Sequence, residues 1–174
     1  MAASKTDPLS ELTRAVPPPE GATRVNWRDV EDQLGFPLPP DFRSVTDVYG
    51  EGIFDDFLWL LHPTSANPHR NLVRQLQVQR ETLAAIELYE GPPPEDLVPW
   101  AMSGNGDVCY WKLDSDPQRL PGRVIAVNEG RGPEWAEYSM SATEWLLAVL
   151  TGRISVPVFP RDFPSSNPTF ESLQ

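Results

Sequence analysis

Apolar residues recur at helical spacing in the first part of the chain, beginning at residue 27. Trp27, Val30 and Leu34 lie at intervals of three and four residues, which places them on one face of a helix. Asn26 is a suitable cap before this stretch, and Gly35 is a suitable residue to end it. The pattern therefore predicts a short helix between these two positions.

The next stretch, LPPDFRSVTDVYGEG, carries a similar pattern between two prolines and two glycines. Pro40 suits the first helical position, and Phe42, Val45 and Tyr49 follow on one helix face. Gly50 is suited to a positive φ angle after the helix, because glycine has no Cβ to oppose it. We therefore expect a helix that ends at Tyr49, rather than a glycine-rich ligand loop.

Two further helices and several strands follow. Asn67-Pro68 resembles the start of a longer helix, and the capping box Ser141–Glu144 opens the last one. Asn105-Gly106 between two apolar runs is a strong signal for a hairpin. The expected strands are Ile53–Leu61, Leu97–Met102, Val108–Leu113, Arg123–Asn128 and Trp135–Tyr138.

This order of elements predicts an α+β fold, with a mostly antiparallel or mixed sheet packed against helices in a single domain. Residues 1–22 contain four prolines and read as a flexible lead-in with no regular structure. The domain itself is expected over residues 23–160. Residues 161–174 are expected to form a Pro-rich tail, extended on the domain and frayed at its tip.

Charge and cysteine content narrow the class of protein. The chain has 14 basic and 25 acidic residues, giving a formal net charge of −11, which argues against direct binding to nucleic acid and suits a basic protein partner. A single cysteine, Cys109, excludes an internal disulfide and fits the reducing cytoplasm. Neither a signal peptide nor an apolar run of the ~20 residues that span a membrane is recognisable. We expect a cytoplasmic protein, and the oligomeric state stays open.

Candidate catalytic and metal-binding residues are few. His62 and His69 lie seven positions apart in a loop, a spacing that does not match a zinc motif, so we interpret both as solvated loop residues. Cys109 lies within an expected strand and lacks the electropositive surroundings that a nucleophilic thiol needs. We therefore expect no enzyme activity, no metal and no cofactor.

Acidic residues gather beside several expected elements together with aromatic ones. One interpretation is a charged surface that keeps the protein soluble. The other is a rim that binds a basic partner, with aromatic contacts to hold it. The candidate partner-binding residues of this second interpretation are Tyr49, Glu51, Asp55, Asp56, Trp111, Glu134, Trp135 and Glu137.

The stretch WRDVEDQLGFPLPPDFRSVTDVYGEG resembles the opening motif of the SUKH superfamily, bacterial immunity proteins related to a yeast cell-wall-synthesis regulator. The blocks NGDVCYW and SATEWLLAVLTG are also similar to its actinobacterial members, so the resemblance covers residues 25 to about 160. The prolines at 92–94 and the Pro-rich tail fall outside the shared pattern.

The resemblance implies a single SUKH-like α+β domain without catalytic residues. It also implies a protein that binds and neutralises a polymorphic toxin, many of which are nucleases. A regulatory module that binds an endogenous protein or a small ligand is the alternative, because the superfamily also contains regulators. The motif residues themselves are expected to specify the fold, with Leu34, Leu38, Phe42 and Leu58 in the core.

Overall fold

The fold is built on one antiparallel sheet of seven strands in the order β6-β5-β4-β3-β2-β1-β7. The computed structural model describes residues 6–22, 24–113, 125–130 and 132–173. The elements are α1 (Pro8–Ala15), α2 (Trp27–Leu34), α3 (Pro40–Tyr49), β1 (Gly52–Phe54), β2 (Leu58–Leu60), α4 (Leu72–Ala84), η1 (Pro94–Asp96), β3 (Leu97–Ser103), β4 (Val108–Lys112), β5 (Ile125–Asn128), β6 (Trp135–Tyr138), α5 (Ala142–Leu150) and β7 (Phe170–Ser172). The predicted single α+β domain is confirmed.

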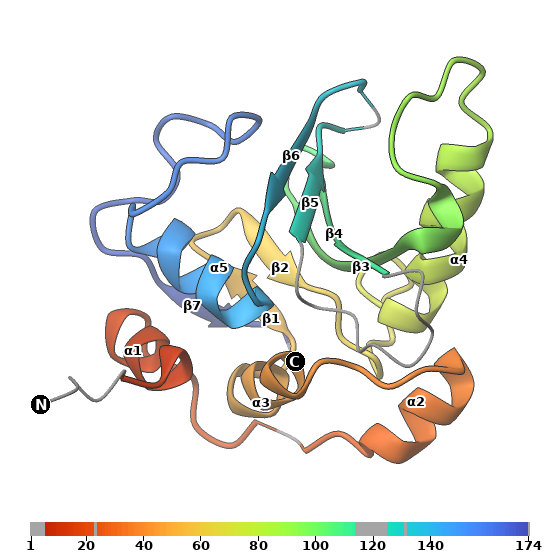
Figure 1. The fold of residues 1–174 in the computed structure, drawn as a ribbon. Helices are drawn as coiled ribbons and strands as arrows, with labels where there is room; N and C mark the ends of the chain where they lie inside the picture. Colours follow the sequence, from red (N-terminus) through yellow and green to blue (C-terminus); the bar gives the residue numbers. More distant parts are fainter. Residues whose placement is uncertain (1–5, 23, 114–124, 131, 174) are drawn as a thin grey trace, which may run out of the picture.

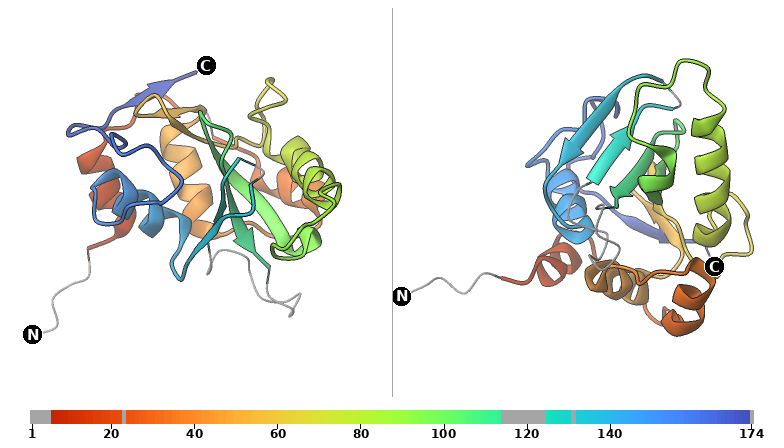
Figure 2. Two further views of the ribbon diagram at one scale, coloured as in Figure 1. Left: turned by 90° about the horizontal axis from the view of Figure 1, so that it is seen from above. Right: turned by 45° about the vertical axis from the view of Figure 1, so that its right-hand side comes forward.

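Helices cover both faces of the sheet (Figure 1). Strand β4 shows how the chain separates them, because successive side chains of a strand point to opposite faces. Cys109 and Trp111 join the large core beneath α1, α3 and α5, whereas Val108 and Tyr110 join a smaller cluster with Leu83 of α4. The right-hand view of Figure 2 shows α4 on the side of the sheet away from α5.

Aromatic rings fill the larger core. The rings of Trp100 and Trp111 stack with centroids 5.9 Å apart, and Trp145 of α5 meets Trp100 edge-on at 5.5 Å. Phe42 of α3 lies 4.9 Å from Trp111. All four side chains are fully buried, so these rings join the sheet to the helices on this face.

The stretch that resembles the family motif forms α2, α3 and the turn between them. Gly50 has a φ of 71° directly after α3, as the sequence predicted. Glu31 of α2 accepts a hydrogen bond from the Leu38 N–H at 2.9 Å and forms an ion pair with Arg43 at 3.4 Å. These polar contacts fix α2 against α3, while Leu38 and Phe42 enter the core.

Asp41 joins α3 to the start of α5. Its Oδ2 accepts hydrogen bonds from the Thr143 N–H and hydroxyl, each at 3.0 Å. Loss of a carboxylate that satisfies a helix N-terminus costs about 1–2 kcal/mol. We expect Asp41→Ala to lower the free energy of unfolding by that amount in urea denaturation, and the exposed Asp32→Ala to leave it unchanged.

The expected strand Ile53–Leu61 is wrong, because two shorter strands form a hairpin there. Asp55 and Asp56 have φ angles of 51° and 54°, and the Phe57 N–H donates to the Phe54 carbonyl, which makes a tight turn between β1 and β2. Positive φ at both central positions gives the twist that suits a hairpin, and aspartate tolerates it better than most residues.

The expected start of the long helix at Asn67-Pro68 is also wrong. The Asn67 side chain accepts from the His69 N–H at 2.9 Å, which closes a local turn instead. Asn71 is the cap, because its Oδ1 accepts from the Arg74 N–H at 3.0 Å. The side chains of Asn67 and Asn71 each accept a hydrogen bond from a backbone N–H two or three residues later. Only Asn71 is followed directly by the helix that packs against β3.

The lead-in also differs from the expectation of irregular structure. Residues 8–15 form α1, capped by Asp7, whose carboxylate accepts from the Ser10 N–H at 3.1 Å. Pro8 is compatible with this helix because it lies in the first turn, where its missing N–H costs nothing. Leu12 is fully buried in the large core, and burial of this face against α5 outweighs the prolines.

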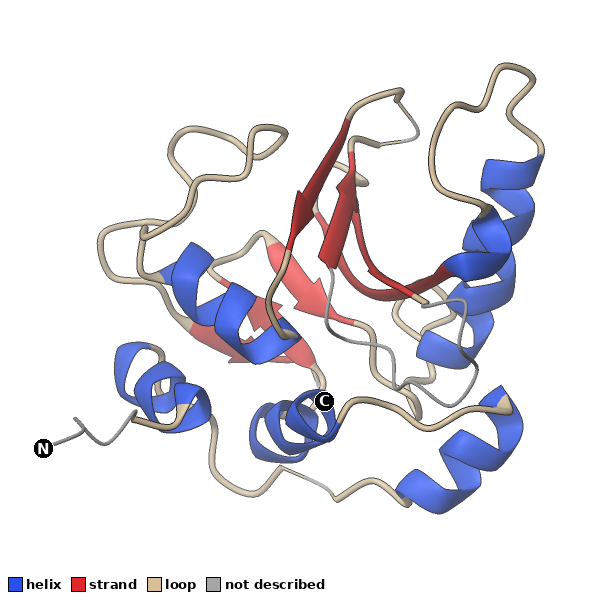
Figure 3. Ribbon diagram, viewed as in Figure 1, coloured by secondary structure: helices blue, strands red, loops and turns tan. Residues whose placement is uncertain are grey.

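The expected frayed tip at the C-terminus is wrong as well, because Phe170–Ser172 pair with β1 as the last strand of the sheet. The segment that leads to β7 folds back along the molecule beside α5 (Figure 3). The described residues contain no helix that is both long enough and apolar enough to cross a membrane.

Candidate partner-binding surface

The sheet order separates the predicted site residues into two groups. Glu51, Asp55 and Asp56 lie beside β1, near the edge formed by β7. Trp135 and Glu137 lie on β6, at the opposite edge. The single rim that the sequence suggested therefore does not form, and each group has to be judged by itself.

Tyr49 and Trp111 are fully buried, so the interpretation of these two residues as partner contacts is wrong. The Tyr49 hydroxyl donates to the Val16 carbonyl at 2.6 Å, and burial raises the pKa of this phenol. Trp111 is enclosed between Trp100 and Phe42. Alternation along β4 placed Trp111 on the face covered by α1, α3 and α5, which the sequence alone did not distinguish from the face covered by α4.

Two of the three acidic residues near β1 already have partners within the chain. Glu51 accepts from the Ser65 hydroxyl at 2.7 Å and forms an ion pair with Arg70 at 3.1 Å. Asp55 accepts from the Ser165 N–H and hydroxyl at 2.6 and 2.8 Å. Asp56 is exposed and has no partner among the described residues, but a single carboxylate does not make an acidic surface.

Trp135 lies in a cluster of rings on the α4 side of the sheet. Its ring is 5.7 Å from Tyr110 and 6.3 Å from Tyr89, which belongs to the loop after α4. Tyr89 donates to the Pro92 carbonyl at 2.5 Å, and burial, aided by the nearby charge of Glu95, raises its pKa to about 12. These contacts bring the loop after α4 against β6.

A groove with a volume of about 320 Å³ opens beside this cluster. Gln79 and Leu83 of α4 form one wall, and the Gln79 amide oxygen lies 3.4 Å from the Tyr110 hydroxyl. The remaining lining comes from β3, β4, β5 and their turns: Met102, Asn105, Gly106, Val108, Tyr110, Asn128 and Gly130. The groove is therefore polar at its turn end, and Tyr110 of β4 contributes an aromatic ring to its lining.

Several exposed carboxylates belong to segments next to the groove residues Leu83 and Gly130. Glu87 and Glu90 come from the loop after α4, and Glu129 and Glu134 flank the β5–β6 turn; the loop and the turn extend in the same direction in Figure 1. Glu95 lies in η1, directly before β3. Among the residues that the structure describes, none of these side chains has a hydrogen bond or ion pair, whereas Glu137 pairs with Lys112 at 2.8 Å. We call these five residues the acidic rim.

Leu88 stands within the acidic rim with 87% of its surface exposed. The sequence analysis missed it, although its position between two glutamates after the last helical turn could have drawn attention to it. A single exposed apolar residue is common on protein surfaces, so Leu88 is included in the candidate surface because it lies next to Tyr89 of the ring cluster and between Glu87 and Glu90 of the rim. The groove, the ring cluster, the acidic rim and Leu88 together form the candidate surface.

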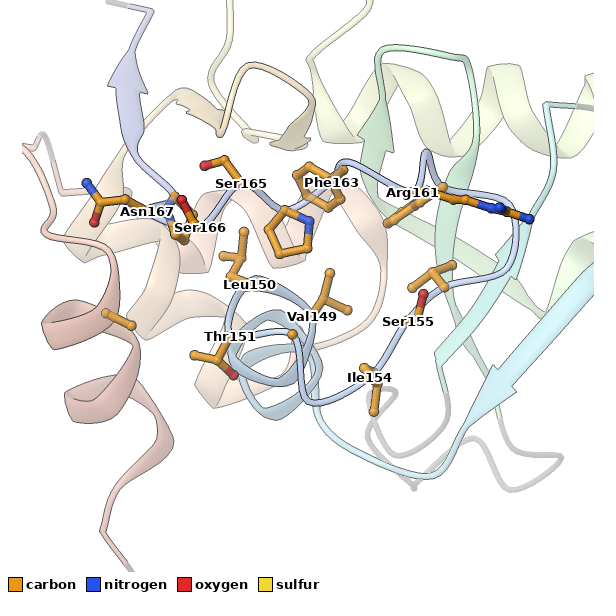
Figure 4. Close-up of a pocket in the computed structure, with 16 residues that line it drawn as sticks. Val149, Leu150, Thr151, Ile154, Ser155, Arg161, Phe163, Ser165, Ser166 and Asn167 are labelled. Atoms are coloured by element: carbon orange, nitrogen blue, oxygen red, sulfur yellow. The ribbon is translucent and has the colours of Figure 1, made fainter.

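A second cavity of about 550 Å³ lies between the end of α5 and residues 155–168 (Figure 4). Val149 and Leu150 face it from the helix, and Phe163 lies across from them. The polar side chains of Ser165, Ser166 and Asn167 belong to an exposed stretch. The cavity thus separates this stretch from α5.

His62 is buried, with 4% of its surface exposed, so its interpretation as a solvated loop residue is wrong. Its Nδ1 lies 3.4 Å from the Thr64 N–H, which makes this nitrogen an acceptor. The described residues contain no group of three side chains suited to hold a metal ion. Cys109 is buried in β4, and burial raises the pKa of its thiol.

A pH dependence follows from His62. Burial lowers its pKa below the usual 6.5, and the charges of Glu51 and Asp47 oppose this only in part. Because the folded state favours the neutral ring, this contribution to stability is complete above about pH 6.5 and is lost as the pH falls through the folded pKa. We expect the Hε1 resonance of His62 to titrate below pH 6.5. The His62→Gln variant should lose less stability over the same acid range in urea denaturation.

The family of the chain is shown by a comparison of its sequence with family models. A model of the SUKH family described as SMI1-KNR4 cell-wall matches residues 25–146, well over half of the 174 residues. The chain belongs to the SUKH family. Neither curated proteins nor solved structures gave a significant match. The matched residues of this SUKH chain include the acidic rim, whereas α1, residues 155–168 and β7 fall outside them.

Proposed function

We propose that this SUKH protein is a cytoplasmic immunity protein that binds and neutralises a basic toxin, such as a nuclease. The observation that carries the proposal is the acidic rim: five exposed carboxylates without partners among the described residues, near a groove and the ring cluster of Tyr89, Tyr110 and Trp135. The proposed activity is binding alone, so it assigns no catalytic residue.

Charge supports this choice of partner. A nuclease keeps a basic cleft for its substrate, and the carboxylates of the rim carry the same sign of charge as the phosphates of that substrate. The net charge of −11 adds a long-range attraction that accelerates association. The half-buried rings of Tyr89 and Trp135 then offer apolar area once the two proteins touch.

Leu88 gives a test that separates binding from folding. We expect Leu88→Ser to raise the dissociation rate of the complex about tenfold, because an exposed apolar residue at the centre of an interface contributes about 1–2 kcal/mol. Its free energy of unfolding should not change, since the side chain is 87% exposed. Leu173→Ser, at the exposed C-terminus, is the matched control and should leave dissociation unchanged.

The function itself is tested with the protein encoded beside this gene. If a large secreted toxin is encoded there, we expect its toxic domain to form a stable complex with this chain and to lose its effect on cells that express it. A folded chain that neither binds nor protects against that domain would overturn the proposal.

A regulatory module is the second candidate, and the family's description as SMI1-KNR4 cell-wall is the observation that favours it. Such a module would bind an endogenous protein through the same surface. Co-purification from the native host distinguishes the two candidate functions. An immunity protein should retain a basic toxin, whereas a regulatory module should retain an endogenous protein that is not a toxin.

A further inference from the structure

The edge strand β7 is the C-terminal segment of the chain and is bound to β1 like a separate peptide. Three residue pairs hold it: Gly52 with Ser172, Ile53 with Glu171, and Phe54 with Phe170. The Asp55 N–H donates to the Thr169 carbonyl at 2.7 Å, and the Leu173 N–H donates to the Glu51 carbonyl at 2.9 Å. The pairing is therefore closed by hydrogen bonds at both ends.

A hollow over Gly52 receives the ring of Phe170. This ring lies 5.0 Å from Tyr49 and 4.8 Å from Phe54. A Cβ atom at Gly52 would stand 2.2 Å from the ring, so only glycine leaves room for it. The edge of β1 thus combines a hydrogen-bonding ladder with a shaped site for one aromatic side chain, which is how sheet edges bind extended peptides.

Between this strand and the body of the protein lies a short connection, residues 164–168. Phe163 precedes it and is fixed by contacts with Phe57 at 4.6 Å and Phe159 at 5.6 Å. Within it, Ser165, Ser166 and Asn167 are exposed, and the 550 Å³ cavity separates it from α5 (Figure 4). Among the hydrogen bonds described for the connection, those of Ser165 to Asp55 fix its position.

The site and the strand that fills it belong to different parts of the chain. Tyr49, Gly52 and Phe54 fall within the residues matched by the family model, whereas Phe170 lies beyond them. The family match therefore covers the residues of the site and leaves out the strand that occupies it. An identical segment from another molecule would make every contact that β7 makes now.

We propose that the β1 edge and its aromatic hollow form an interface with a second copy of this chain, in which two molecules exchange their β7 strands. Exchange replaces each contact of β7 within one chain by an identical contact between two chains. The equilibrium between monomer and exchanged dimer therefore depends on the connection and on the protein concentration. A five-residue connection spans at most about 17 Å, which requires the two β1 edges to face each other closely. The interface lies at the opposite edge of the sheet from the acidic rim, so dimer formation leaves the rim free.

Cysteine pairs test this exchange directly, because Ile53 and Glu171 face each other across the two strands. One preparation carries Ile53→Cys and a second, with a tag of different mass, carries Glu171→Cys. We expect a disulfide-linked heterodimer after the two are mixed at high concentration just below the unfolding temperature and then oxidised. The buried Cys109 should stay outside the reaction.

Two controls make either result decisive. The double variant Ile53→Cys with Glu171→Cys should close a disulfide within one chain, because partners in an antiparallel pair have Cα atoms about 5.5 Å apart. The mixture of Asp32→Cys with Glu171→Cys, in which the first residue is exposed on α2, should give only background linkage. Closure within the double variant without heterodimers above that background would overturn the proposal, as would a double variant that fails to close.

Discussion

We expect the double variant Glu87→Lys with Glu90→Lys to associate with the toxin about tenfold more slowly than the natural protein. Each substitution removes a negative charge and adds a positive one, so the two together change the net charge from −11 to −7. Both side chains are exposed and, among the described residues, unpaired. The change therefore acts on attraction rather than on folding.

Salt dependence identifies the electrostatic origin of this effect. The screening length is about 8 Å at physiological ionic strength, so added salt should slow association of the natural protein and have less influence on the variant. The control is Glu20→Lys with Asp32→Lys, which makes the same change of net charge on exposed residues outside the rim. Equal slowing by both pairs would contradict a local role for the acidic rim.

The second large effect concerns stability. We expect Trp100→Ala to lower the free energy of unfolding by about 3–5 kcal/mol, because it opens a cavity between Trp111 and Trp145 in the large core. The matched variant Trp100→Phe should cost much less, since it keeps a ring there and removes a buried indole N–H that has no partner among the described residues. Urea denaturation of the two variants measures both values, and an equal loss would contradict the packing role.

The sequence predicted those elements whose signals are local. The helical spacing before Gly50 and the capping box at Ser141 specified α3 and α5, and both are present. The turn at Asp55 and Asp56 was missed, because two aspartates adopt positive φ far less often than Asn-Gly. The bulge next to Pro99 was missed too, and it lets a proline lie within a central strand that pairs on both sides.

Long-range contacts explain the other differences. Burial of Leu12 against α5 stabilises helix α1, and the rings around Phe170 stabilise strand β7. In both cases the partner residues lie more than a hundred positions away in the sequence. For the candidate surface, the sequence identified Glu134 and Trp135. It did not reveal that the loop after α4 packs against β6, which requires the contact between Tyr89 and Trp135.

Hydrogen exchange on the natural complex tests the central claim most directly. With the partner that co-purifies from the native host, amide protection should increase in residues 85–95 and 128–137, which carry the acidic rim, Leu88 and the ring cluster. Exchange near β1 and in residues 163–173 should not change, because those segments lie at the other edge of the sheet. New protection confined to that edge, or to α1 and α5, would contradict the assignment of the partner-binding surface.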